Sequence, residues 1–274
     1  NAGDYLVLGG NVQHPSGFFN PAGDLQLVRL NNLGNLVNPG RIIGQDVAES
    51  AVWMEKATDC NGAAGYIIAA NQYNGPGHDM LLTLTNAGGS PTWVRRIGTL
   101  ADDERSACVK QDASGNFILV GTRTDAGTGL STVHAVKTDC KGNLLWERIY
   151  DAGISVRTAS VTAFATSMAA CGNQPAEYFV TGTVSAVAGG NEEVFILSLN
   201  AATGSVSFMH TYDIAQGADD VATCIQGNCT ATPLANGGLW VSGYTLDAGG
   251  SAPKKVLLLQ TDLNGNLVWA NNYD

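Results

Sequence analysis

Short apolar runs separated by turns rich in Gly, Asn and Asp recur along the whole chain. One class of run ends in a small residue, and its members are YLVLG (5–9), YIIAA (66–70), FILVG (117–121), YFVTG (178–182) and LWVSG (239–243). A second class follows, at 24–30, 79–84, 132–137, 193–199 and 255–260. Runs this short, rich in β-branched and aromatic residues and bounded by turn residues, predict strands joined as hairpins.

Two further segments complete a repeating unit. A weaker strand precedes four of the five hairpins, at 50–57, 105–112, 159–166 and 220–227. A turn and an outgoing strand follow each hairpin, and in four copies an aromatic residue stands four positions after a turn glycine: Gly89 and Trp93, Gly142 and Trp146, Gly204 and Phe208, Gly265 and Trp269. In the first copy, Asn38 takes the aromatic position after Gly34. The first-class runs end at residues 9, 70, 121, 182 and 243, so the unit recurs every 51 or 61 residues.

Four short strands in hairpin order are the content of one propeller blade. The sequence therefore predicts an all-β fold, a five-bladed β-propeller with four-stranded antiparallel blades. All of residues 1–274 form one domain, with blades at about 1–44, 45–99, 100–151, 152–213 and 214–274. The first blade lacks its inner strand, because the sequence begins directly at the second strand of the unit.

The repeats resemble those of secreted bacterial β-propeller proteins, which run roughly GYIVAG, then D-LLKLD-GN, then W-K-Y. The matching stretches here are YIIAA, DMLLTL and GGSPTW in one repeat, and FILVG and TVHAVKTDCKGNLLWERIYD in the next. The resemblance covers nearly the whole chain and implies the fold and a secreted setting. Such repeats share no catalytic residues, so it implies no active site.

The net charge of the chain and the length of its apolar segments argue against nucleic-acid partners and against membrane insertion. The net charge is −10 and the 14 basic residues are scattered, which argues against nucleic acid and anionic membrane surfaces. No segment approaches the ~20 consecutive apolar residues of a membrane span. The sequence starts at Asn1 without a signal peptide, which fits a secreted chain already processed or a fragment.

Six cysteines in a Gly-rich β chain of this kind predict disulfides, although six cysteines allow fifteen connectivities. Positions in the repeat favour Cys60–Cys108, Cys140–Cys171 and Cys224–Cys229. A metal site is not expected, because no C-x₂-C spacing occurs and the calcium-like segment at 262–266 has Tyr273 where a bidentate Glu is needed. No cofactor is predicted.

The leading hypothesis is an extracellular, non-enzymatic propeller acting as a structural, self-assembling or adhesive module that binds other proteins or copies of itself. The uncharged final strand suggests interface residues at Trp269 and Tyr273. The Gly/Pro loop at 14–23 contains the adjacent aromatics Phe18 and Phe19, which mark an interface if they are exposed and are structural if they are tucked beneath the loop. A glycan-binding propeller is an alternative, with contacts at Tyr73 and His78.

A five-bladed glycoside hydrolase is the third hypothesis. Its chemistry needs two carboxyl groups at a defined separation, one of them with a raised pKa. Asp102, Asp103, Asp219 and Asp220 stand before inner strands, where such groups would surround a channel. The same pair of acids in equivalent repeats favours a blade-entry turn instead.

Overall fold

The computed structural model describes residues 5–12, 24–43, 47–150, 155–164, 176–185, 191–228, 237–246 and 254–274. These residues contain strands and turns and no helix, so they include no helix long and apolar enough to cross a membrane. The first sheet contains β1 (Tyr5–Val12), β2 (Asp24–Leu30) and β3 (Leu36–Ile43). The second contains β4 (Glu49–Thr58), β5 (Ala64–Tyr73), β6 (His78–Asn86) and β7 (Pro91–Ile97).

The remaining three sheets repeat the four-stranded pattern. The third contains β8 (Asp103–Gln111), β9 (Phe117–Thr124), β10 (Ser131–Thr138) and β11 (Leu144–Tyr150). The fourth contains β12 (Ser155–Phe164), β13 (Glu177–Ser185), β14 (Glu192–Asn200) and β15 (Val206–Tyr212). The fifth contains β16 (Asp219–Asn228), β17 (Gly238–Leu246), β18 (Lys255–Asp262) and β19 (Leu267–Tyr273).

Every sheet is an antiparallel meander in which each strand pairs with its neighbours in sequence. The all-β fold is thus confirmed, and the strands lie where the periodic runs predicted them. In the described residues the first sheet has three strands and begins at the second strand of the unit, as predicted.

Burial follows strand order within each sheet. The two central strands are covered on both faces, as in β6 and β14, whose interior residues are almost all buried. The last strand is the most exposed, as in β7 and β11. This gradient explains why the central strands read as continuous apolar runs in the sequence while the outer strands read as mixed.

The small residue that ends each first-class run has a packing role. A bulge interrupts the inner strand between Ser106 and Cys108 in β8 and between Ala222 and Cys224 in β16. At these points the inner backbone lies so close that a Cβ on Gly121 or Gly243 would overlap a main-chain carbonyl group. The inner strands of the other two four-stranded sheets are also bulged, between Ala51 and Trp53 and between Thr158 and Ser160. Since a bulge strengthens the local twist, the same feature shapes all four of these sheets.

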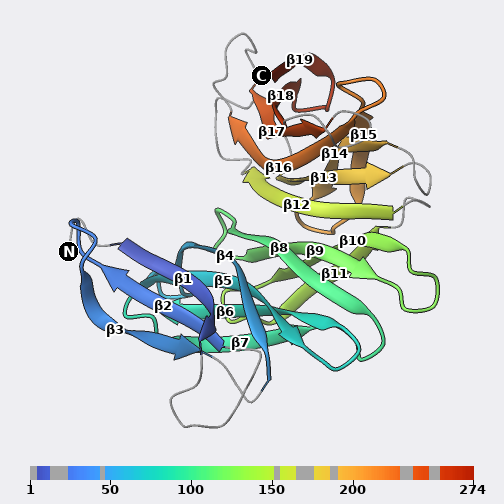
Figure 1. Cartoon of the computed structure of the whole chain (residues 1–274). Coiled ribbons are helices and arrows are strands. Elements are labelled where there is room, and N and C mark those ends of the chain that lie inside the picture. The colour runs from blue at the N-terminus through green and yellow to red at the C-terminus, as the bar shows by residue number, and fades with distance from the viewer. Residues whose placement is uncertain are drawn as a thin grey trace.

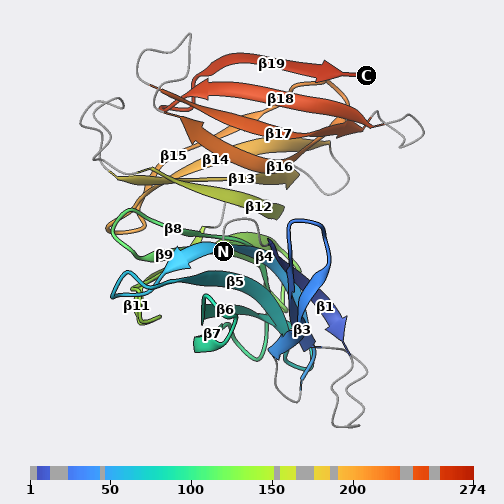
Figure 2. The same cartoon turned by 90° about the vertical axis from the view of Figure 1, so that its left-hand side faces the viewer.

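Successive sheets pack on one another to form an array. Strand β4 packs on the first sheet, β8 on the second, β12 on the third and β16 on the fourth, and apolar clusters fill the joints. Figure 1 shows the first sheet at the lower left and the fifth at the top, and Figure 2 again places them at opposite ends. The closed propeller ring that the sequence predicts is not seen among the described residues.

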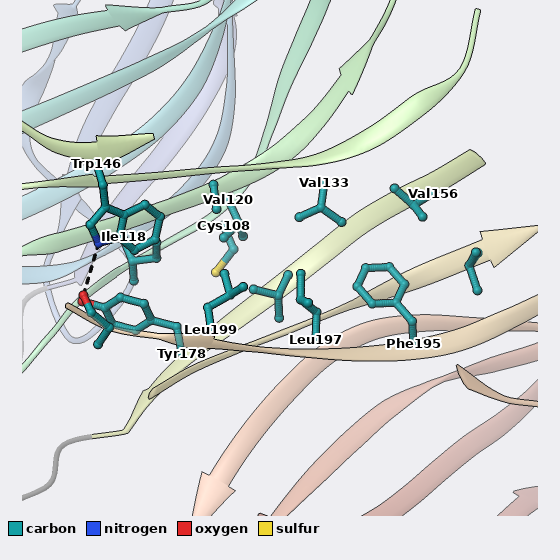
Figure 3. Close-up of a cluster of buried hydrophobic side chains, with 14 residues drawn as sticks. Cys108, Ile118, Val120, Val133, Trp146, Val156, Tyr178, Phe195, Leu197 and Leu199 are labelled. Carbon is teal, nitrogen blue, oxygen red and sulfur yellow. Dashed lines mark hydrogen bonds between the residues drawn. The ribbon is translucent and has the colours of Figure 1, made fainter. Parts of the chain in front are cut away.

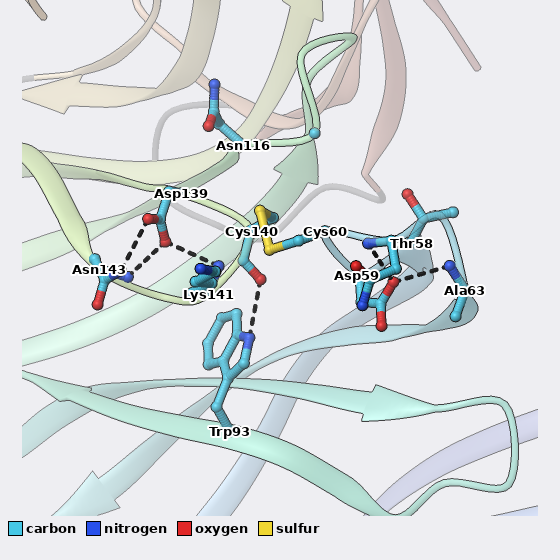
Figure 4. The surroundings of a disulfide bond; sticks show 12 residues. Thr58, Asp59, Cys60, Ala63, Trp93, Asn116, Asp139, Cys140, Lys141 and Asn143 are labelled. Atoms are coloured by element: carbon cyan, nitrogen blue, oxygen red, sulfur yellow. Dashed lines mark hydrogen bonds between the residues drawn. A yellow bond between two sulfur atoms is a disulfide. The ribbon is translucent and has the colours of Figure 1, made fainter.

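A disulfide joins Cys60 to Cys140, with a Cα–Cα distance of 5.2 Å (Figure 4). The predicted pairs Cys60–Cys108 and Cys140–Cys171 are therefore wrong. The bond links the turn after β4 to the turn after β10, so it ties the second sheet to the third. These two turns lie side by side because β8 brings the third sheet against the second, an arrangement that spacing alone did not show.

The other cysteines have different outcomes. Cys108 is buried, and the Sγ of Cys224 lies 3.9 Å from the carbonyl oxygen of Ile225, to which its thiol donates. Cys224 is therefore a thiol, not part of the predicted Cys224–Cys229 bond. Cys171 and Cys229 lie outside the described residues.

Candidate functional site

The turn before the last strand has one recurring geometry in the first, second, third and fifth sheets. In the third sheet Asp139 Oδ1 accepts from the backbone N–H groups of Lys141 and Asn143, both at 2.8 Å. Gly142 adopts φ 76°, a left-handed conformation suited to glycine. Asn31 makes the same two bonds in the first sheet, to the N–H groups of Leu33 and Asn35, and Asp262 makes them in the fifth.

This turn receives an aromatic ring from the preceding sheet. A Cβ on Gly142 would lie 2.9 Å from the Trp93 ring, and one on Gly204 would lie 3.0 Å from the Trp146 ring. Phe208 stands against Gly265 in the same way. The repeated aromatics therefore act as wedges between sheets, and glycine is required both for the backbone conformation and for the close approach of the ring.

Hydrogen bonds to the turn carbonyls fix the two tryptophan wedges, Trp93 and Trp146. Trp93 Nε1 donates to Cys140 O at 3.1 Å (Figure 4), and Trp146 Nε1 donates to Ala201 O at 3.2 Å. Figure 3 shows the Trp146 bond beside the buried cluster that lies between the third and fourth sheets. A buried indole N–H needs such an acceptor, so the hydrogen bond holds the ring in one position against the turn.

A tyrosine four residues after the wedge adds a second bond. The Tyr150 hydroxyl donates to Gly204 O at 2.5 Å, and the Tyr212 hydroxyl donates to Gly265 O at 2.6 Å. Burial raises the pKa of both tyrosines, which keeps both hydroxyls protonated as donors. The sequence carries the signal for these bonds in the recurring phrase endings IYD, TYD and NYD, but the role of the tyrosines in joining sheets was missed.

Lys137 contributes a third donor to the joint between the third and fourth sheets. Its Nζ donates to Ala201 O at 2.7 Å and lies 3.3 Å from Asp112 Oδ2, which also accepts from the Tyr178 hydroxyl at 2.6 Å. Lys137 pairs directly with Trp146 across β10 and β11. Two donors from neighbouring strands thus converge on one turn carbonyl.

Two of the predicted interface residues, Trp269 and Tyr273, lie on β19 in the last sheet. Trp269 is half-buried, its Nε1 donates to Gln260 Oε1 of its own sheet at 2.7 Å, and its ring lies edge-on to Trp240. Tyr273 is 47% exposed. Phe18 and Phe19 lie outside the described residues.

The predicted glycan contacts are neighbours. Tyr73 and His78 pair across β5 and β6, and their rings meet edge-on with centroids 5.7 Å apart. His78 Nδ1 lies 2.9 Å from Asp103 Oδ1, which also accepts from the His78 backbone N–H. Tyr73 is 46% exposed, so one part of its ring faces solvent while the His78 ring packs against it.

Two members of the predicted acidic pairs join neighbouring sheets. Asp103 accepts from the backbone of the first residue of β6, and Asp219 accepts from the Glu192 backbone N–H, at the first residue of β14. Burial raises the pKa of Asp103, but hydrogen bonds from Arg105 and His78 outweigh it and lower the pKa. These two carboxylates therefore make equivalent hydrogen bonds to the preceding sheet.

Asp102 fixes the loop between β9 and β10, and Asp220 fixes the loop that enters the inner strand β16. Asp102 accepts from the Ala126 backbone N–H, which lowers the pKa of Asp102 despite burial, and from Arg123 at 2.6 Å. Asp220 accepts from the backbone N–H groups of Ile214 and Ala215. The Asp220 contacts are those of a blade-entry turn, whereas the Asp102 contacts tie two parts of one sheet together.

Two neighbouring buried acids, Asp79 and Glu104, were not predicted from the sequence. Asp79 pairs with Arg96, and Glu104, buried nearby on β8, accepts from the backbone N–H of Thr99 at 3.1 Å. Burial raises the pKa of Glu104, and the charge of Asp79 adds to the effect. The two acids are 25 residues apart in sequence, so only the packing of β8 on β6 shows their proximity.

The candidate binding surfaces among the described residues are open hollows. The described residues contain no cluster of three or more His, Cys, Asp or Glu side chains that could hold a metal ion. An open hollow of about 460 Å³ lies between the third and fourth sheets, lined mainly by hydroxyl side chains together with Asp103, Arg105 and Glu192.

Comparison with known proteins supports the fold alone. No protein-family model matches the chain, and no curated protein matches it. Among solved structures, the chain is similar to a crystal structure of a protein of unknown function from Dyadobacter fermentans DSM 18053. The two are 12% identical, the match covers 98% of this chain and 90% of that one, and the TM-score is 0.51.

Proposed function

We propose that this chain is an extracellular, non-enzymatic structural module whose five sheets are blades of the β-propeller type. It works by binding protein surfaces, and the first of these is another copy of itself. One observation carries the proposal. Aromatic side chains of one sheet donate to the turn of the next sheet, while the turn of the first sheet and the aromatic residues of the last sheet make no such contact among the described residues.

The state of the carboxylates supports a non-enzymatic role. A glycosidase needs an acid with a raised pKa facing a second carboxylate across a substrate pocket. Asp102 and Asp103 instead have lowered pKa values and are held by Arg123, Arg105 and His78. Glu104 has a raised pKa, but its side chain is buried between sheets, where no sugar can reach it.

The disulfide supports an oxidising compartment. Cys60–Cys140 joins two sheets across 80 residues of sequence, and such bonds persist in exported proteins while the cytosol keeps thiols reduced. An extracellular setting also fits the resemblance of the repeats to secreted bacterial propellers.

A glycan-binding role has one supporting observation, the exposed Tyr73 ring resting against His78. A propeller lectin with one site per blade would repeat this platform. The residues at the same register in the other four-stranded sheets are Thr124, Ser185 and Leu246. The support is thus confined to one site. A glycan-binding assay tests this alternative, and binding that is lost in Tyr73→Ala would favour it.

Sedimentation velocity of the intact chain over a wide range of concentrations tests the proposed function. We expect the mean particle mass to rise with concentration, and electron microscopy to show assemblies of regular width. A chain that sediments as a single monomeric species at every concentration contradicts self-assembly.

A further inference from the structure

The turn glycine has a different environment in the first sheet from that in the later sheets. Gly89, Gly142, Gly204 and Gly265 are all buried. Gly34 is exposed, and a Cβ placed on it would meet nothing within 4 Å, although its φ of 78° and its turn hydrogen bonds match those at Gly142 and Gly265. The first sheet therefore has a turn of the same conformation at 31–35, here called the seat, against which no described aromatic ring packs.

The last sheet presents the complementary half. Trp269 and Tyr273 have the four-residue spacing of Trp146 and Tyr150, and Trp269 pairs with Gln260 across the sheet as Trp146 pairs with Lys137. Trp146 is only 6% exposed and its indole reaches the next sheet, whereas the Trp269 indole donates back to Gln260. Among the described residues, the Trp269 indole therefore has no turn carbonyl as its acceptor.

Gln260 carries an unused donor at this position. Its side chain is buried, and its Nε2 has no hydrogen-bond partner. The equivalent Lys137 donates to the carbonyl of the next turn. A buried donor without an acceptor is costly, so the last sheet is incomplete in the same respect in which the third sheet is complete.

The two surfaces are also compatible in charge. The seat at 31–35 reads NNLGN, and the last strand at 267–273 reads LVWANNY, so neither contains a charged residue. Joining them removes no charge of either segment from water. Leu33, 77% exposed at the tip of the turn, stands where the third sheet has Lys141, and it adds apolar area to the contact.

We propose that the last sheet of one copy docks on the 31–35 turn of a second copy and so reproduces the internal joint between molecules. The Trp269 ring covers Gly34 of the second copy, with Nε1 donating to Asn32 O, and the Tyr273 hydroxyl donates to Gly34 O. This inference rests on the proposed function and names the surfaces that carry it. A second copy is the occupant because one chain contains both halves, and these lie at opposite ends of the array (Figures 1 and 2).

The joint is heterologous, because it brings two different surfaces together. Each added copy leaves one free seat and one free wedge, so the contact extends into a filament or a large ring and does not stop at a dimer.

Single substitutions at each end test the joint. Gly34→Asn keeps a residue that tolerates positive φ but places a side chain where the Trp269 ring must lie. Gly62→Asn is the matched control, since Gly62 has the same φ of 78°, the same open space and the same Asx turn, made by Asp59. At the other end Trp269→Ser with Tyr273→Phe removes the wedge and its hydroxyl, and Tyr73→Phe is the control at an equally exposed tyrosine.

Mixing the two end variants is the decisive measurement. Each variant keeps one intact half, so we expect each alone to sediment as a monomer and an equimolar mixture to form dimers and nothing larger. The Gly62→Asn and Tyr73→Phe controls should assemble like the unmodified chain.

The outcomes separate this inference from the proposed function. If the unmodified chain assembles and the end variants still assemble, the docking surfaces are wrong and self-assembly stands. If the unmodified chain stays monomeric at every concentration, both are overturned. If it stays monomeric and Gly34→Asn lowers its melting temperature while Gly62→Asn does not, the wedge docks within one chain, which also overturns docking between copies.

Discussion

The joint between the third and fourth sheets and the free face of the fifth sheet contain nearly the same side chains in different states. Trp146 and Tyr150 donate to Ala201 O and Gly204 O of the next sheet. Trp269 and Tyr273 stand at the same positions, yet Trp269 bonds within its own sheet and Tyr273 is half exposed. Local sequence prepares the donors, and the neighbouring sheet decides whether they are used.

The turns give the same comparison from the other side. Asn31 and Asp139 hold their turns with identical hydrogen bonds, and Gly34 and Gly142 have almost the same φ. Only Gly142 has an indole against it. A turn of this kind therefore forms without its wedge, so the first sheet can present a preformed docking site at no further cost in backbone ordering.

The largest expected effect comes from the disulfide that joins the second and third sheets. Replacing Cys60 and Cys140 by Ser releases a loop of 80 residues, which lowers the free energy of unfolding by about 4 kcal/mol. Cys224→Ser is the control, since that thiol bonds only to its neighbour's carbonyl. Urea unfolding followed by fluorescence measures the change, and equal midpoints for the double variant and the control would contradict it.

The second effect compares the two tryptophans directly. Trp146→Ala leaves a cavity between two sheets and costs about 3 kcal/mol, whereas Trp269→Ala in dilute monomer costs about 1 kcal/mol because the ring is only half-buried. Unfolding in guanidinium chloride gives both values. Similar losses at the two sites would show that the last sheet is covered within one chain.

The third effect concerns the two turn glycines. Alanine at either site meets the cost of positive φ, about 1 kcal/mol. At Gly142 the new methyl group must also displace the Trp93 ring, so Gly142→Ala is less stable than Gly34→Ala by about 2 kcal/mol. Thermal unfolding of both variants at low concentration measures the difference, which should shrink at concentrations where Gly34 becomes covered.

The smallest effect tests the acidic part of the joint between the second and third sheets. Because the pKa of Glu104 is raised in the folded chain, its contribution is favourable below the unfolded pKa and is lost as the pH rises through the folded pKa. Glu104→Gln should therefore stabilise the chain at pH 7 by on the order of 1 kcal/mol and have little effect near pH 4. Melting curves at both pH values test this.

Asp220→Asn is the comparison for that experiment. Asp220 accepts from two backbone N–H groups and from Thr245, so loss of its charge should destabilise the fifth sheet at pH 7. Stabilisation by Asp220→Asn would contradict this expectation, because it would mean that the cost of burying the Asp220 charge exceeds the gain from its hydrogen bonds.

Much of the fold was predictable because each strand contains its own signal. The first-class runs ending at Gly121 and Gly243 lie in the central strands, and the glycine-to-aromatic spacing located the turn and the wedge. For the candidate site, Trp269 and Tyr273 were found for a related reason, an uncharged last strand, although their acceptors were not.

Pairings between sheets were less predictable. Cys60 meets Cys140, not Cys108, because the turn after β10 lies beside the turn after β4 once β8 has packed on the second sheet. The proximity of Asp79 and Glu104 depends on the same packing. Neither contact has a fixed sequence separation, because inter-sheet contacts depend on three-dimensional offsets.

The sequence by itself determined the strands, the meander order, the Asx turns and the positions of the wedge donors. These are short-range features, set by the strand period, by glycine's access to positive φ and by side-chain bonds spanning two to four residues. Tertiary structure alone decided which cysteines bond, which carboxyls are buried together and which wedges find a carbonyl. These outcomes depend on how one sheet lies against the next, and that is fixed by the packing of apolar faces, which is non-directional and leaves no local pattern in the chain.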